Sequence, residues 1–300
     1  MSAHGEHGTS FTRKVIETRI TLMEGAFGAA TPPMVLRSFG TSATVTRPGL
    51  PDKESASVTI SGLSYETMAR LTTLGFLPGE PYRNRIALLA GQEGAPLSSI
   101  FMGEIVRSWA DFNTAPDPVL RIEALSGFFP SLIAEEPLSR EGSVSLADLL
   151  GEIAARIGYS FENHGSTALL RNPVLNGSPL EKAMEAAAQV GETLLVEDDR
   201  MIVLPAGRAR RGAPVALDAR SGLVGYPTFT SEGVSFRCLF NPNLAHAGLV
   251  QLKSIVPRAS GLWQITRLTH RLETSGPGSG AWFSEVEACY APGEHHVETP

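Results

Sequence analysis

The segment VSFRCLFNPNLAHAGLVQLKS, residues 234–254, combines two runs of alternating apolar residues with an interruption between them. Val234 and Phe236 alternate in the first run, and Val250 and Leu252 alternate in the second. Period-two alternation is typical of a strand with one buried face. Pro242 lies between the runs, and its missing backbone N–H ends a strand. The segment therefore predicts two strands joined through a turn.

The rest of residues 213–293 continues the same pattern. The run GLWQITRLTHRLET alternates over residues 261–274, and AWFSEVEACY returns as its partner across the glycine-rich hairpin tip SGPGSG. Uninterrupted alternation predicts that Trp263, Ile265 and Arg267 share one face of the first strand. We therefore expect a β-barrel-like domain at residues 213–293.

Residues 11–130 are expected to form another β-barrel-like domain, with one inserted helix. Alternating runs occur at RKVIETRITLM, SASVTISGL, RIALLAG, SSIFMGEIVRSW and VLRIEALSG. The helix is predicted from SYETMARLTTLGF, where Ser64 can cap the amino end and Gly75 suits the C′ position. Met68 and Leu71 lie three residues apart and face the core.

Residues 140–207 have helical periodicity and predict a small α+β domain. In SVSLADLLGEIAARIGY the apolar residues recur every three or four positions, and Ser143 or Ser145 can cap that helix. A second helix begins at the sequence Ser-Pro-Leu-Glu of residues 178–181, which matches a capping box with proline in the first turn. ETLLVEDDRMIVLP then predicts a hairpin that turns at Asp198-Asp199. The fold class is thus mainly β with α+β, two barrel-like domains flanking a small α+β domain.

The connections and ends of the chain are polar. RARRG, residues 208–212, is interpreted as a solvated hinge between domains, because three arginines beside a Gly-Ala-Pro linker are more typical of a hinge than of a nucleic-acid site. Residues 1–10 and 294–300 are interpreted as flexible tails. Their paired histidines lack the carboxylates or thiols of a metal site, so no metal is predicted there.

The overall charge argues against a protein that grips nucleic acid. The formal net charge is −6 and the pI about 5.7. Affinity for a phosphate backbone comes mainly from Lys and Arg, so an acidic chain is a poor candidate. It is compatible with a surface past which DNA slides.

Two cysteines and no targeting signal suggest a soluble protein made in the cytoplasm. Cys238 and Cys289 give no disulfide framework or zinc spacing, so free thiols are expected, although a single disulfide between them stays open. The amino end has no signal-peptide pattern. No run approaches 18 apolar residues, so no helix is expected to span a membrane.

No catalytic or cofactor motif is present. GPGSG joins two strands and lacks the Lys-Ser/Thr partner of a phosphate loop, and no GxSxG, SxxK or HExxH occurs. His270 has no identifiable nucleophile or carboxylate partner, so we expect a structural role. Trp263 and Trp282 are expected on adjacent strands, in a core or at a subunit interface. We predict no enzyme activity and no cofactor.

Two segments resemble a known family. RIALLAGQEGAPLSSIFMGEIVRSW resembles a strand–loop–strand pattern of the baseplate hub proteins of contractile-tailed phages and related injection particles (late control protein D-like), although Gln92 stands where an aromatic residue is often seen. GVSFRCLFNPNLAHAGLVQLKS with GLWQITRLTHRLETSGPGSGAWFSEVEA resembles the second hub barrel. The predicted assembly and fold signature comprises Gly91, Phe101, Gly103, Phe240, Asn241, Pro242, Gly248, Trp263, His270 and Trp282.

The resemblance implies an assembly role. Hub proteins of this kind are homotrimers in which two barrels per chain give a pseudo-sixfold ring. The ring joins the hexameric tail tube protein to the trimeric central spike protein, contacts other baseplate or tail proteins, and lines the channel through which DNA passes without specific binding. The resemblance implies a place in the virion tail baseplate after synthesis in the host cytoplasm, with no membrane partner.

Two other functions remain as alternatives. A tail-associated cell-wall hydrolase would need a cleft holding two acids, or a histidine with a nucleophile. A monomeric β-rich binding module would stay monomeric at high concentration. A turnover assay on peptidoglycan and a solution mass measurement separate these alternatives from a hub.

Overall fold

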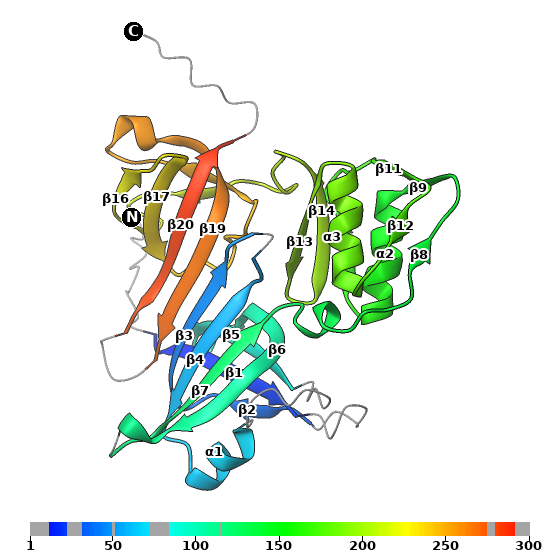
Figure 1. The fold of residues 1–300 in the computed structure, drawn as a ribbon. Helices are drawn as coiled ribbons and strands as arrows, with labels where there is room; N and C mark the ends of the chain where they lie inside the picture. Colours follow the sequence, from blue (N-terminus) through cyan, green and yellow to red (C-terminus); the bar gives the residue numbers. More distant parts are fainter. Residues whose placement is uncertain are drawn as a thin grey trace, which may run out of the picture.

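The computed structural model describes residues 12–22, 32–49, 52–72, 84–114, 116–274 and 280–291. Within these ranges the chain is mainly β with few helices (Figure 1). The predicted tails at 1–10 and 294–300, and most of the SGPGSG tip, lie outside the described residues.

Thirteen strands of the described part of the chain form one large sheet. Its main path runs in the spatial order β16 (Leu223–Phe229), β17 (Gly233–Leu239), β20 (Trp282–Tyr290), β19 (Gly261–Glu273), β3 (Gly40–Arg47), β4 (Ser55–Ser61), β7 (Val119–Leu125), β6 (Ser98–Asp111), β5 (Arg85–Gln92), β1 (Lys14–Thr21) and β2 (Met34–Leu36). β18 (Leu249–Leu252) pairs with β19, and β15 (Val215–Leu217) pairs with β18 in the sheet's one parallel contact among the described strands. These strands close no barrel, so the predicted mainly β class is confirmed in that coarser form.

The strand that joins the two β-rich regions was not predicted from the sequence. β3 pairs with β4 on one side and with the carboxyl-terminal half of β19 on the other. Thr41, Ala43 and Val45 of β3 are buried and alternate with less buried residues. The sequence of β3 alternates as a strand does. The pattern is weak, because three of its eight residues are threonine and none is a large apolar residue.

A β-bulge changes which side chains of β19 face inward. The pairing of β19 with β20 shifts between Ile265 and Arg267. Trp263 and Ile265 are buried before the shift, whereas Leu268 is buried and Arg267 exposed after it. The prediction that Trp263, Ile265 and Arg267 share a face was therefore wrong for Arg267. A bulge inserts one residue and reverses the alternation, which a period-two pattern does not anticipate.

The two β-rich regions contain an equivalent four-stranded unit. We call β3-β4-β7-β6 repeat A and β16-β17-β20-β19 repeat B. β6 is the last strand of repeat A, and β19 is the last strand of repeat B. β6 has a bulge where it pairs with β7, and β19 has one where it pairs with β20. Ile105 and Arg107 lie opposite Ala124 and Glu123 in repeat A.

Repeat B has the same residue types around its bulge. Ile265 and Arg267 lie opposite Ala288 and Glu287. The arginine forms an ion pair with the glutamate in both repeats, Arg107 with Glu123 and Arg267 with Glu287. The two repeats therefore correspond in strand order and in the residues around this bulge.

The helices match the capping signals. α2 (Leu146–Ile157) begins after Ser145, which accepts a hydrogen bond from Asp148 N, and Gly158 ends it in the left-handed conformation. The predicted capping box at the start of α3 (Pro179–Gln189) is confirmed. α1 (Tyr65–Leu71) has the predicted Ser64 cap and has Thr72 as its C-cap residue; the predicted C′ residue Gly75 lies outside the described residues. None of the described helices is long and apolar enough to cross a membrane.

The helices α2 and α3 cover a three-stranded sheet. This sheet has the order β10 (Ser160–Asn163), β14 (Arg200–Pro205), β13 (Glu192–Glu197). The hairpin between β13 and β14 turns at Asp198 and Asp199, as predicted, and both have positive φ. Two short pairs complete this unit: β8 (Leu138–Ser139) with β12 (Val174–Leu175), and β9 (Ser143–Ser145) with β11 (Leu169–Arg171).

Each part has its own apolar core. One buried cluster lies under repeat A, one lies under repeat B, and one joins the helices to β13 and β14. Leu272 and Trp282, from the ends of β19 and β20, belong to the cluster under repeat A. Repeat B therefore contributes side chains to the core of repeat A, which ties the two repeats together.

Candidate functional site

Three of the predicted signature residues meet where the two repeats join. The Phe240 ring lies edge-on to His270 and to Trp282, with ring centroids 5.3 Å and 5.5 Å away. His270 also contacts Ser284, with 2.8 Å between Nδ1 and Oγ. The sequence did not single out Ser284, because a lone serine on an alternating strand carries no signal.

The His270 ring is enclosed by the sheet junction. His270 pairs in register with Val45 of β3 and with Ser284 of β20. Burial, together with the positive charge of Arg47, lowers the pKa of His270 to about 3. A neutral imidazole at this position is a packing and hydrogen-bonding group.

Asn241 and Pro242 form the turn that follows β17. The Asn241 backbone N–H donates to Ser284 Oγ (3.2 Å), and its side-chain oxygen accepts from Asn243 N (3.0 Å). Phe240 N donates to Trp282 O at 3.0 Å. The turn is therefore tied to β20 and places Phe240 over His270.

Gly91, Phe101 and Gly103 lie away from this cluster, on β5 and β6. Phe101 is fully buried in the core of repeat A. A Cβ on Gly103 would lie 2.6 Å from the Leu125 carbonyl oxygen and 2.8 Å from Phe101 Cζ. A Cβ on Gly91 would lie 3.0 Å from a side-chain carbon of Leu97. Gly103 is thus required by the close approach of β7.

Trp263 belongs to the core of repeat B, and Gly248 lies just before β18. Gly248 O accepts from Ile265 N at 2.9 Å, which leads the chain into β18 beside β19. The buried Trp263 donates from Nε1 to Ala259 O (3.0 Å) and stacks on Tyr290, with ring centroids 4.7 Å apart. Trp263 and Trp282 lie on adjacent strands, as predicted, but at opposite ends and in different cores.

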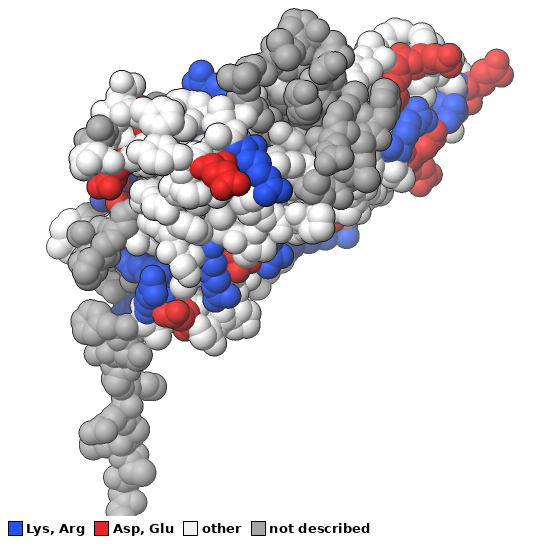
Figure 2. All heavy atoms as spheres, turned by 90° about the horizontal axis from the view of Figure 1, so that it is seen from below, with Lys and Arg blue, Asp and Glu red and all other residues white. Residues whose placement is uncertain are grey.

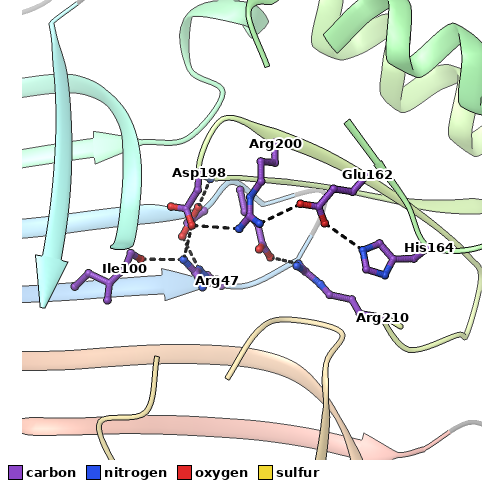
Figure 3. Close-up of polar contacts among 9 residues, drawn as sticks. Arg47, Ile100, Glu162, His164, Asp198, Arg200 and Arg210 are labelled. Carbon is purple, nitrogen blue, oxygen red and sulfur yellow. Dashed lines mark hydrogen bonds and ion pairs between the residues drawn. The ribbon is translucent and has the colours of Figure 1, made fainter. Parts of the chain in front are cut away.

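A buried network of charged groups connects the helical unit to repeat A (Figure 3). Arg47, at the end of β3, donates from Nε to Glu54 (2.6 Å) and from one terminal nitrogen to Asp198 (3.0 Å). The same nitrogen donates to Ile100 O at 2.9 Å. Arg85 forms a second ion pair, with Asp199. The Asp198-Asp199 turn thus forms ion pairs with Arg47 of repeat A and with Arg85 of β5.

The predicted solvated hinge is wrong for Arg210. Its side chain is about nine-tenths buried and donates to Glu197 at 2.6 Å. Its backbone N–H donates to Ala247 O at 2.8 Å. Arg208 and Arg211 are exposed. Arg210 therefore connects β13, through Glu197, to the loop before β18, through Ala247. The buried Glu197 carboxylate is the charged partner that a buried arginine requires.

The outer part of the network is partly solvated. Arg200 contacts both Asp198 (3.6 Å) and Glu162 (3.2 Å), and His164 contacts Glu162 at 3.2 Å (Figure 3). The backbone N–H of Arg211 donates to His164 Nδ1 at 2.9 Å. Glu162, Arg200 and His164 extend the network to the edge strand β10.

Repeat B approaches the network through His246. Burial lowers the pKa of His246 to about 4, against the opposing charge of Glu197. A Cβ on Gly49, whose φ is +79°, would lie 2.5 Å from His246 Cε1. A cavity of about 10 Å³ is left between these groups, Arg47 and Glu197, so the junction is closely packed.

One face of the main sheet is polar, and its charges are paired across strands. Repeat A carries Arg107 with Glu123 and Arg121 with Asp111. Repeat B carries Glu285 between Arg237 and Arg271, and Arg267 with Glu287. Seen from below, the described surface also shows basic groups beside acidic ones, with uncharged surface between them (Figure 2).

The described side chains were compared with the requirements of a metal site and of a reactive thiol. Among them no group of three or more His, Cys, Asp or Glu could hold a metal ion. Cys238 and Cys289 are free thiols, which confirms the expectation for them. Burial raises the pKa of Cys238 to about 11, so this cysteine is a poor nucleophile.

The fold is that of phage tail proteins. The 43 kDa tail protein of prophage MuSo2 from Shewanella oneidensis has a TM-score of 0.59 at 8% identity, covering 93% of this chain and 97% of that chain. The tail protein from Neisseria meningitidis MC58 has a TM-score of 0.59 at 12% identity, covering 92% and 96%. A chain of the Francisella PdpA–VgrG complex has a TM-score of 0.57 at 7% identity, covering 93% and 58%. A search of the curated proteins returned no match.

These likenesses show a shared fold. The model of the family described as Baseplate hub gp41 matches residues 41–277. The chain belongs to this family. It is a non-enzymatic structural component of the phage tail baseplate.

Proposed function

We propose that the chain forms a homotrimer with pseudo-sixfold symmetry, which joins a hexameric tail tube to a trimeric central spike. The observation that carries this proposal is the repetition of one four-stranded unit within a continuous sheet. Two repeats in each of three chains make six similar units. A trimer can thus present a nearly sixfold face to the tube and a threefold face to the spike.

In this proposal the domain boundaries follow the sequence prediction. Residues 11–130 and 213–293 are the two barrel-like tube units, and residues 140–207 are the α+β unit held beside them. The buried pairs of Arg47 with Glu54 and Asp198 support a fixed attachment of the α+β unit. In this proposal the ten signature residues have packing roles. The junction between the repeats is stabilised by Phe240, Asn241, Pro242, His270 and Trp282, and the two cores are stabilised by the others.

The polar face of repeats A and B is proposed to line the DNA channel. Each of its arginines lies against a carboxylate on the same or a neighbouring strand, so few cations remain to neutralise phosphates. Thr44, Thr46 and Ser57 occupy the middle of this face. Local charge pairing, rather than net negative charge, is what keeps such a surface from retaining DNA.

The test is a count of subunits in the assembled particle. The chain is co-expressed with its candidate tail tube and spike partners, and the complexes are imaged by electron microscopy. Three copies around a central channel are expected. A persistent monomer in solution, and no association with either partner, would contradict the proposal and favour a binding module.

A further inference from the structure

Repeats B and A are joined within the chain by one pairing of strands. In that join the carboxyl-terminal half of β19 pairs antiparallel with β3. Thr269 lies opposite Thr46, His270 opposite Val45, and Arg271 opposite Thr44. Val45 and His270 are both buried by this pairing.

Each repeat also has an outer strand that is equivalent to β19 or β3. Among the described residues, these outer strands lack the equivalent pairing. The equivalent of β19 in repeat A is β6, whose residues 98–104 pair with β5 and whose residues 104–111 pair with β7. Among the described residues, no strand pairs with the second edge of residues 109–111. The equivalent of β3 in repeat B is β16, the last strand of the sheet path (Figure 1).

The pairing registers of the strands determine which residues of repeat A correspond to which residues of repeat B. Ile105 and Ile265 both lie opposite the alanine that follows the paired glutamate, so Trp109, Ala110 and Asp111 correspond to Thr269, His270 and Arg271. The pairings of β3 with β4 and of β16 with β17 make Thr228, Phe229 and Thr230 the equivalents of Thr44, Val45 and Thr46.

The outer strand β16 has a side chain that is more exposed than its equivalent on β3. Val45 is fully buried in the chain, whereas its equivalent Phe229 is 50% exposed. Tyr226 on the same strand is 69% exposed, and Phe112, just after β6, is 59% exposed. An open edge with exposed aromatic residues is a surface that pairs readily with another chain.

We infer that β16 of one chain pairs antiparallel with the carboxyl-terminal end of β6 of a second copy of this chain, in the register of the internal β19–β3 join. Trp109 then lies opposite Thr230, Ala110 opposite Phe229, and Asp111 opposite Thr228. The contact is head-to-tail, because each chain has one β16 edge and one β6 edge. Such contacts close a ring when the rotation between neighbouring chains divides a full turn evenly. The inference rests on the proposed trimer and names the strands and residues that build it.

The test is disulfide cross-linking between chains. Directly opposite Cα atoms in an antiparallel pair are about 4.5–5.5 Å apart, within the range that a disulfide spans. The test variant is Trp109→Cys with Thr230→Cys, in a background with Cys238→Ala and Cys289→Ser. Thr46→Cys with Thr269→Cys is the internal control, because these residues are already opposite one another. Trp109→Cys with Thr228→Cys is the off-register control, since diagonal neighbours lie about 7–8 Å apart.

Assemblies with tube and spike proteins are oxidised and analysed on non-reducing gels. We expect covalent dimers and trimers from the test variant, at least tenfold more than from the off-register control, and an internal cross-link in the Thr46/Thr269 variant. A trimer by electron microscopy without cross-linking of the test variant, while the internal control closes, would overturn the register and leave the proposed function intact. Absence of any trimer would overturn both.

Discussion

The buried His270 predicts a specific loss of stability in acid. The unfolded chain binds a proton at this residue near the ordinary pKa of 6.5, whereas the folded chain binds it only near 3. Between those values, falling pH adds protons to the unfolded state and lowers the free energy of unfolding. From about pH 7.5 to about pH 4.5, His270 alone accounts for a loss of about 2.6 kcal/mol, at about 1.4 kcal/mol per pH unit below 6.5.

The measurement is urea unfolding followed by circular dichroism at these two pH values. His270→Gln keeps a polar side chain near Ser284 but does not titrate, so its loss between the two pH values should be smaller than that of the parent chain by about 2.6 kcal/mol. His246 and the carboxyl groups contribute equally to both proteins. Trp263→Phe, a change in the core of repeat B, should lower stability by the same amount at both pH values. Equal losses in the parent and in His270→Gln would refute the reasoning.

Three further substitutions test other parts of the structure. Arg47→Met leaves the buried Glu54 and Asp198 without their cation and should cost about 3–5 kcal/mol in urea unfolding, so a loss under about 1 kcal/mol would contradict a buried junction. Gly103→Ala places a methyl group against the Leu125 carbonyl and should cost about 1–3 kcal/mol, whereas Gly151→Ala in α2, with 3.6 Å to Phe161, should be neutral or stabilising. Phe229→Asp should leave the stability of the single chain unchanged within about 0.5 kcal/mol yet reduce the trimer fraction by analytical ultracentrifugation; an unchanged trimer fraction would exclude Phe229 from the interface.

Local signals in the sequence were sufficient for the helices and for most strands. Ser145 and the Ser178 capping box act within a single turn of helix, so their effect can be read from neighbouring residues. The Asp198-Asp199 turn is similarly local. The same signals failed where a distant partner decides the outcome, as at Arg210, whose burial depends on Glu197 and Ala247.

Some residues of the candidate site were named from the sequence, but their arrangement was not predicted. Phe240, His270 and Trp282 were named separately, and the structure brings their rings together. The charged network around Arg47 was missed, although the paired aspartates and the RARRG run were both visible in the sequence. Single charged residues in loops give no indication of which opposite charge they will meet, because the partners come from segments far apart in the chain.

By itself the sequence determined a mainly β chain with a small α+β unit between two β-rich regions, no catalytic motif, and a resemblance to baseplate hub proteins. Alternation and capping depend on neighbouring residues, so they are written along the chain. Only the tertiary structure decided that the β-rich regions share one sheet and that each repeats the same four strands. Strand pairing through β3 depends on backbone hydrogen bonds to β19, more than two hundred positions along the chain, and the bulge in β19 arises where β19 pairs with β20. No period-two pattern encodes either feature.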